Sequence, residues 1–179
     1  SSRYKLSAPE LEFFINNAAR LDILAIDALP ITTPAATSAQ VSGLLRLNDW
    51  IKVKGLYNLR TLEYLDILKA SLGTTSKIAW QQLILDRTKW KLEDLTFLTG
   101  DASTTGILDT LYSNTVINNE FRKGSLLLQL FDLMSAVGRI GLSPALTYNA
   151  LKTNLQMADA RNIRKAAKAK YSDVEWSKV

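Results

Sequence analysis

The residues of this chain that could do chemistry are carboxylates, lysines and serines, because the sequence contains neither histidine nor cysteine. The missing types exclude a Ser-His-Asp triad, a Cys-His pair and the common kinds of zinc site. Carboxylates stand close together at three places, where they could in principle do acid–base work. These pairs are Glu63 with Asp66, Glu93 with Asp94, and Asp22 with Asp27. No glycine-rich phosphate loop and no metal-ligand spacing accompany them, so we interpret them as charged residues on solvated helix faces. We therefore predict no catalytic residue, no cofactor site and no metal site.

The stretch SLGTTSK, at residues 71–77, places serines and a lysine around one glycine. It lacks the G-x-x-x-x-G-K-[ST] pattern, and a single glycine does not form a phosphate cradle. We interpret it as a loop between two helices. A hydrolase with an unusual Ser-Lys or carboxylate site is a remaining hypothesis, and it predicts a deep polar pocket that holds perturbed carboxylates or a buried lysine.

A strongly basic segment lies at residues 158–170, where Asp159 is the only acid. Basic side chains recur there at positions i, i+3, i+4 and i+7, so they share one helix face. These residues are Arg161, Arg164, Lys165 and Lys168. Such a face is the electrostatic footprint of a phosphate-binding helix, and it could give weak, salt-sensitive affinity for nucleic acid.

The opposite face of this basic helix is formed by small residues. They are Ala158, Ala160, Ile163, Ala166, Ala167 and Ala169. The segment lacks the interleaved aromatic residues of single-strand binders and the large apolar face of a membrane-surface helix. We favour a packed helix with a solvated basic side and expect no nucleic-acid partner. The alternative is a free-standing helical nucleic-acid-binding or protein-interaction module that uses residues 158–170.

Composition indicates a globular helical protein. The 179 residues are 47% apolar and 22% charged, with a net charge of +5, which is enough apolar material for a buried core. The longest uncharged stretch, residues 28–45, contains two prolines and is not expected to span a membrane. The first residues include neither an initiator methionine nor an apolar signal core, so we expect a fragment whose targeting signal is missing.

Helix signals occur almost throughout the chain. Ser7 and Glu10 form a capping box, with Pro9 in the first turn. We expect the segment at 21–38 to be an irregular connector. Ser38 is predicted to be the N-cap of a second helix that ends at Gly55, with an inward face of Val41, Leu44, Leu45, Asn48 and Ile51. Asn58 is predicted to be the N-cap of a third helix that ends at Gly73, with Leu62, Leu65 and Leu68 inward.

Further helices are predicted in the second half of the chain and just before it. A fourth helix starts near Ser76, and Thr88 caps a short fifth that ends at Gly100. The longest helix is predicted from about Val116 to Ile140. Ser143 caps the next one, and the basic helix runs from about Leu155 to Lys170. The apolar face of the longest is Leu126, Leu127, Leu130, Phe131, Met134 and Val137. A capping box at Ser172 predicts one more helix, and we expect Trp176 to pack back near Tyr171. No alternating pattern requires a strand. The prediction is an all-α bundle of roughly eight to ten helices, with a lobe boundary expected near 100–106, the loop GDASTTG.

The order of these pieces resembles one known family. Its members' motifs are similar, in sequence order, to LSAPELEFF (6–14), LDILAIDALPI (21–31), LLRLNDWIKVKGLYN (44–58), TKWKLEDLTFL (88–98) and ARNIRKAAKAKYSDVEWSKV (160–179). The last match, an alanine-rich basic helix followed by Lys-Ala-Lys-Tyr and a tryptophan, is the best. Lys89 and Lys91 depart from the Gly and Asp that the family has around its tryptophan. The chain thus resembles the A subunit of bacterial Tc (toxin complex) insecticidal toxins and the A-type proteins of virulence plasmids, in the helical shell ahead of the neuraminidase-like region.

This resemblance implies a structural role. Such A subunits assemble as five-fold bells, in which a helical shell surrounds a translocation channel and the B–C components dock on top. The resemblance therefore implies a non-catalytic scaffold, partners that are other A protomers and the B–C components, and a secreted or cell-surface toxin. We expect the isolated fragment to be a monomer.

Overall fold

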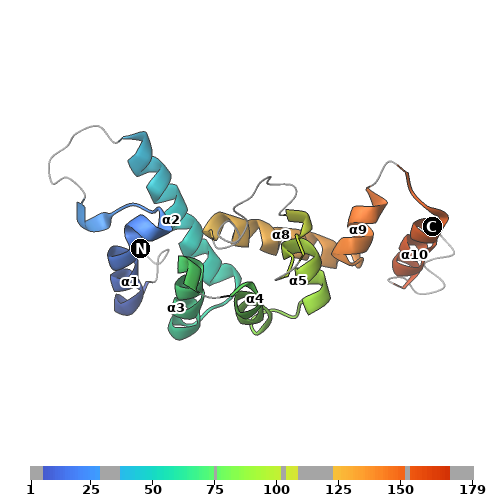
Figure 1. Cartoon of the computed structure of the whole chain (residues 1–179), viewed down its shortest axis with the longest axis horizontal. Coiled ribbons are helices and arrows are strands. Elements are labelled where there is room, and N and C mark those ends of the chain that lie inside the picture. The colour runs from blue at the N-terminus through green and yellow to red at the C-terminus, as the bar shows by residue number, and fades with distance from the viewer. Residues whose placement is uncertain are drawn as a thin grey trace. The chain divides into compact units, whose positions relative to one another are not determined.

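The chain is helical in almost every part that the structure describes. The computed structural model describes residues 6–28, 37–74, 76–101, 104–108, 123–151 and 154–169 (Figure 1). Eight α-helices and no strand occur within these ranges. This confirms the predicted all-α, multi-helix fold. The expected capping box at Ser172 and the packing of Trp176 lie outside the described residues.

The chain divides into two compact units. Unit 1 is Ser1–Lys89 with Asn114–Gln129, and unit 2 is Trp90–Ser113 with Leu130–Val179. The expected boundary at 100–106 therefore falls inside unit 2, and the unit boundaries lie at Lys89 and, within a helix, at Gln129.

The described part of the loop at 100–106 closes on itself, which explains why it does not separate the units. The Thr104 N–H donates to Asp101 Oδ1 at 2.7 Å, and the Asp101 N–H donates to the Thr104 carbonyl oxygen at 3.1 Å. The Gly100 and Gly106 backbones lie in direct contact, so a Cβ at either position would clash with the other. Gly100 also has a φ of 71°, a value that favours glycine.

Unit 1 is built from α1 (Ala8–Leu21), η1 (Ile26–Ala28), α2 (Ser38–Leu56), α3 (Thr61–Lys69), η2 (Ala70–Thr74), α4 (Lys77–Leu85) and the first residues of α8 (Gly124–Ile140). Helix α3 packs against α1, α4 and η2. The core is aromatic at its centre. Its largest buried side chains are Phe14, Trp50, Tyr57, Tyr64, Ile67, Leu68, Trp80, Ile84 and Leu127. Burying this apolar surface is the main force that holds the helices together.

Two buried tyrosines tie the unit 1 helices together through backbone oxygens. Tyr64 Oη donates to the Trp50 carbonyl oxygen at 2.7 Å, and Tyr57 Oη donates to the Leu127 carbonyl oxygen at 2.9 Å. Phe14 packs edge-on against Tyr64 with 6.2 Å between ring centroids. Trp50 and Trp80 are buried and belong to the core.

Helices α1 and α2 end in the same way, each with a polar residue at positive φ just after its last residues. Asp22 (φ 54°) and Asn58 (φ 50°) occupy the left-handed region. After Asp22, the Ile23 N–H donates to the Ala18 oxygen, and after Asn58, the Leu59 N–H donates to the Lys54 oxygen, both at 3.0 Å. This is the Schellman arrangement. Asn58 therefore ends α2 and is not the N-cap of α3, contrary to the prediction.

The predicted N-cap of α2, Ser38, was one residue late, and the prediction that Gly55 ends the helix was also wrong. Thr37 is the N-cap, because Gln40 stands three residues later and its Oε1 accepts from the Thr37 N–H at 2.9 Å, whereas Ser38 is followed at that distance by a valine. The helix continues through Gly55 to Leu56. In α3, Arg60 is the N-cap and its N–H donates to Glu63 Oε2 at 3.0 Å. Leu62, predicted to point inward, is 77% exposed.

Unit 2 contains α5 (Leu92–Thr99), the remainder of α8, α9 (Pro144–Ala150) and α10 (Met157–Lys168). Helix α9 packs against α5 and α10. Buried residues are Leu95, Leu98, Leu108, Leu130, Met134 and Val137. Phe97 packs edge-on against Tyr148 at 6.0 Å. The predicted apolar face of α8 is thus confirmed, with Phe131 half-buried beside Trp90 at 6.1 Å.

Three predictions about these helices need correction. Thr88 does not cap α5; its hydroxyl donates to the Ile84 oxygen at 3.1 Å in the turn that follows α4, and Lys91 is the N-cap. Helix α8 begins at Gly124, and the residues from 116 to 122 lie outside the described ones. With 17 residues, α8 is shorter than the 19-residue α2. The predicted caps at Ser7 and Ser143, the helix start near Ser76 and the helix end at Gly100 are confirmed.

Candidate interaction surfaces

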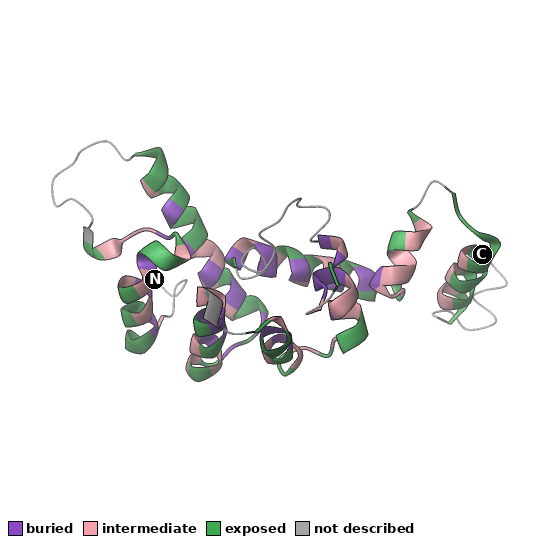
Figure 2. Cartoon of the chain, in the orientation of Figure 1, coloured by how far each residue is buried: buried purple, intermediate pink, exposed green. Residues whose placement is uncertain are grey.

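The basic side chains of α10 lie together on an exposed face. Arg161, Arg164, Lys165 and Lys168 are exposed and line one shallow groove with Ala158 and Asn162. Figure 2 shows that α10 contains no buried residue. On the side opposite the groove, Ile163, Ala166 and Ala167 are half-buried. Packing against α9 therefore covers the alanine side only in part. The arrangement can attract anions through Coulomb forces, which salt screens.

Helix α2 exposes the apolar face that the sequence predicted to be inward. Val41, Leu44 and Leu45 are 48%, 52% and 59% exposed. The buried side instead carries Gly43, Leu47, Trp50 and Val53. Gly43 decides the orientation, because it lets the backbone of residue 24 approach so closely that a Cβ would lie 2.7 Å from the Leu24 nitrogen. Two residues in the sequence could have indicated the true inner face. Gly43 allows a close backbone approach, and Trp50 is a large side chain that is buried.

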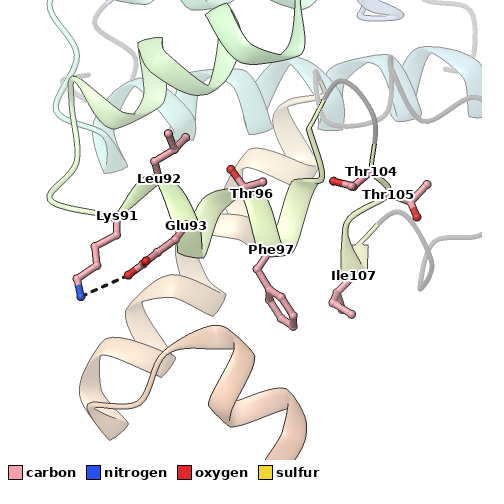
Figure 3. Close-up of a pocket in the computed structure, with 8 residues that line it drawn as sticks. All are labelled: Lys91, Leu92, Glu93, Thr96, Phe97, Thr104, Thr105 and Ile107. Carbon is pink, nitrogen blue, oxygen red and sulfur yellow. Dashed lines mark ion pairs between the residues drawn. The ribbon is translucent and has the colours of Figure 1, made fainter.

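A shallow groove of about 840 Å³ lies beside α5 (Figure 3). Its apolar lining comes from Leu92, Phe97 and Ile107, and Lys91 Nζ lies 3.6 Å from Glu93 Oε1 at one end. Burial and the neighbouring Glu93 raise the pKa of the Asp94 carboxyl, while Lys91 partly opposes this shift. Of the Glu93–Asp94 pair, Glu93 lines this open, mostly apolar groove, whereas Asp94 is not one of its lining residues, so the groove does not bring the two carboxylates together.

One member of each of the other two carboxylate pairs is occupied in ion pairs and caps. Glu63 Oε1 lies 3.0 Å from Arg87 Nη1 and 3.3 Å from Arg60 Nε. Asp22 Oδ2 lies 2.7 Å from Arg46 Nη1. In the described ranges, no group of three or more acidic side chains is placed to hold a metal ion.

A buried ion pair between α1 and α2 was not predicted. Glu10 is 0% exposed, and its Oε2 accepts from Lys54 Nζ and from the Ser7 N–H, both at 2.8 Å. Burial alone would raise the pKa of Glu10, but Lys54, the Ser7 N–H and the nearby Thr61 hydroxyl together hold it below its ordinary value. Lys54 Nζ also lies 5.8 Å from the centre of the Tyr64 ring. Burial and the Glu10 charge raise the pKa of Tyr64.

The sequence did not predict this ion pair, because each of its two residues also fits a common local pattern. Glu10 satisfies a capping box, which suggests a solvated residue, and Lys54 stands near the end of a predicted helix, where lysine is common. Nothing local links the two positions across 44 residues. The hydrolase hypothesis predicts a perturbed carboxylate in a deep polar pocket. The buried Glu10 carboxylate instead links α1 to α2 through Lys54.

No single helix among the described residues is long and apolar enough to cross a membrane. Helices α8 and α9 meet the length and composition test only when taken together, with a 78° bend between them. Comparison of the chain with family models, with curated proteins and with solved structures found no match.

Proposed function

We propose that this chain is a non-catalytic structural segment of a Tc-type toxin A subunit, in which it helps to form the helical shell around the translocation channel. The ordered motifs from LSAPELEFF to the basic helix suggest the family. The all-α fold agrees with a shell built from helices. Its partners would be other protomers and neighbouring parts of the same assembly, with B–C components docking on the whole, in a secreted or cell-surface toxin.

The observation that carries the proposal is the exposed apolar face of α2. Val41, Leu44 and Leu45 form a stripe at helical spacing on one side of a long helix. Contiguous exposed apolar surface marks places where another protein surface packs. A shell of helices that contact helices in neighbouring protomers supplies such a surface.

Negative-stain imaging of the full polypeptide that contains this segment tests the proposal. We expect bell-shaped particles with five-fold symmetry. Leu44→Glu should reduce the assembled fraction at least about tenfold, because it places a charge in an apolar interface. Ala39→Glu, which adds the same charge at an exposed position elsewhere on α2, should leave assembly unchanged. Small monomeric particles from the unmodified polypeptide would refute the shell role.

A second candidate is a helical nucleic-acid-binding module, which the exposed basic groove on α10 favours. It predicts duplex binding that weakens steeply with salt, because phosphate contacts release counterions. Replacing Arg161, Arg164, Lys165 and Lys168 by alanine should abolish that binding, whereas replacing Arg139 and Lys52, exposed basic residues outside α10, should not. Binding that persists in the α10 variant would eliminate this candidate.

A further inference from the structure

We propose that a cavity in unit 1 binds a soluble ligand that carries a phosphate group. The cavity has a volume of about 400 Å³ and lies where the end of α1, the middle of α2, η2 and the start of α8 meet. Three cationic side chains line it, namely Arg20, Arg46 and Lys123. Among the described residues that line it, Asp22 is the one carboxylate. This lining favours an anionic group that accepts hydrogen bonds from the guanidinium groups of Arg20 and Arg46.

Both guanidinium groups are held in place by unit 1 itself. Arg20 Nη2 donates to the Leu72 carbonyl oxygen at 3.1 Å. Arg46 Nη1 lies 2.7 Å from Asp22 Oδ2 and donates to the Asp22 carbonyl oxygen at 3.0 Å. Each of these contacts uses part of a guanidinium that has five N–H donors, so donors remain for a ligand. Guanidinium groups match the geometry of phosphate oxygens and bind them through paired hydrogen bonds.

The wall of the cavity is closely packed. Gly124, the first residue of α8, lies against α2, and a Cβ there would be 3.0 Å from the Trp50 nitrogen and 3.1 Å from its ring atom Cδ2. The Trp50 side chain is buried, and it lines the cavity together with Gly124 and Ser125. A rigid wall preorganises the cationic groups, which lowers the entropic cost of binding.

The stretch SLGTTSK contributes to this cavity in a way that its sequence did not suggest. Ser71 and Leu72 line the cavity as part of η2. The Ser71 hydroxyl donates to the Ile67 oxygen of α3 at 2.9 Å, so its proton is already used in a local hydrogen bond. Leu72 supplies the carbonyl oxygen that anchors Arg20. The stretch therefore positions a cation and is not itself a phosphate cradle.

Asp22→Asn provides the sharpest test, because it should strengthen binding. Asparagine is tolerated at the positive φ of Asp22, so the backbone is retained, while the charge that competes for Arg46 is removed. We expect calorimetric titration with inorganic phosphate and with glycerol 3-phosphate to show roughly threefold tighter binding, the size of one partly screened charge. Asp66→Asn, an exposed position outside the cavity, should leave the affinity unchanged. Equal affinities for wild type and Asp22→Asn would contradict the proposal.

Arg46→Gln breaks the same ion pair and should have the opposite effect. We expect phosphate binding to weaken about tenfold, since a charge-assisted donor is lost. Lys52→Gln removes one positive charge from an exposed position on the same helix and should have little effect. If both charge-removing variants weakened binding alike, the affinity would reflect net charge and not this cavity.

Amide NMR shifts locate the ligand. Addition of glycerol 3-phosphate should shift the Leu72, Gly124 and Ser125 signals and leave Leu95, in unit 2, unaffected. Binding to phosphatidic acid vesicles without any binding of the soluble ester would overturn the proposal of a soluble ligand. An absence of shifts at the three cavity amides would overturn the site itself.

Discussion

The carboxylate of Glu10 accepts hydrogen bonds from the Ser7 N–H and from Lys54 Nζ, so one side chain both caps α1 and fastens it to α2. Its other oxygen, Oε1, is buried and accepts no hydrogen bond within the described part of the chain. A buried charge that loses its partner is costly, because no water replaces the missing interaction. The pair therefore makes the attachment of α1 sensitive to both partners.

The lowered pKa of Glu10 predicts acid sensitivity. In the unfolded chain the carboxyl titrates near its ordinary value of 4.5, and in the folded chain it titrates lower. The stabilising contribution is therefore complete above pH 4.5 and is lost as the pH falls through the folded pKa. Glu10→Gln should lower the free energy of unfolding by about 3 kcal/mol at pH 7, and by much less at low pH.

Urea unfolding followed by circular dichroism at pH 7 and at pH 3 measures this difference. Glu12→Gln is the matched control, because Glu12 is exposed on the same helix, and we expect a change below about 0.5 kcal/mol. A loss for Glu10→Gln that was equal at both pH values would mean that the ionised form of Glu10 makes no contribution.

For the helix α2, close backbone packing determines which face is buried, and the hydrophobic pattern alone predicts the wrong face. Its aliphatic stripe predicted one inner face, but close packing at Gly43 and the volume of Trp50 turn the helix the other way. A stripe of leucines can be buried by any partner, whereas a glycine at a close approach allows only one packing. The stripe is consequently left exposed in this chain.

Gly43→Ala should destabilise unit 1, although alanine is the better helix former. The new Cβ would lie 2.7 Å from the Leu24 nitrogen and 3.1 Å from the Ile23 carbonyl carbon, so α2 must shift, and we expect a cost of about 1–3 kcal/mol. Gly55→Ala, in the same helix with no atom within 4 Å of the new Cβ, should instead stabilise by up to about 1 kcal/mol. Thermal unfolding of both variants separates steric clash from helix propensity, and stabilisation by both would show that α2 adapts freely.

At the scale of the whole molecule, local sequence signals predicted the fold class and several helix ends. Ser7, Ser76, Ser143 and Gly100 act within one turn of their own helix, so their effect can be read without knowledge of the fold. The basic face of α10 was predicted for the same reason, because its members share one helix.

Long-range contacts account for what the sequence did not predict. The Glu10–Lys54 pair and the cavity with Arg20, Arg46 and Lys123 join residues from different helices. Two helix stops were also missed or misassigned, because Asp22 and Asn58 take the place of the usual glycine. The division into units at Lys89 and Gln129 follows from packing, and no break in composition marks it.

The contact between Gly100 and Gly106 has a practical consequence for protein engineering. Because the two backbones lie side by side after α5, the loop between them begins and ends at nearly the same point within unit 2. A folded domain whose own termini are adjacent can be inserted between these two glycines without disrupting the packing of α5. A fluorescent or affinity module carried there would label the parent polypeptide internally, with both of its natural ends left untouched.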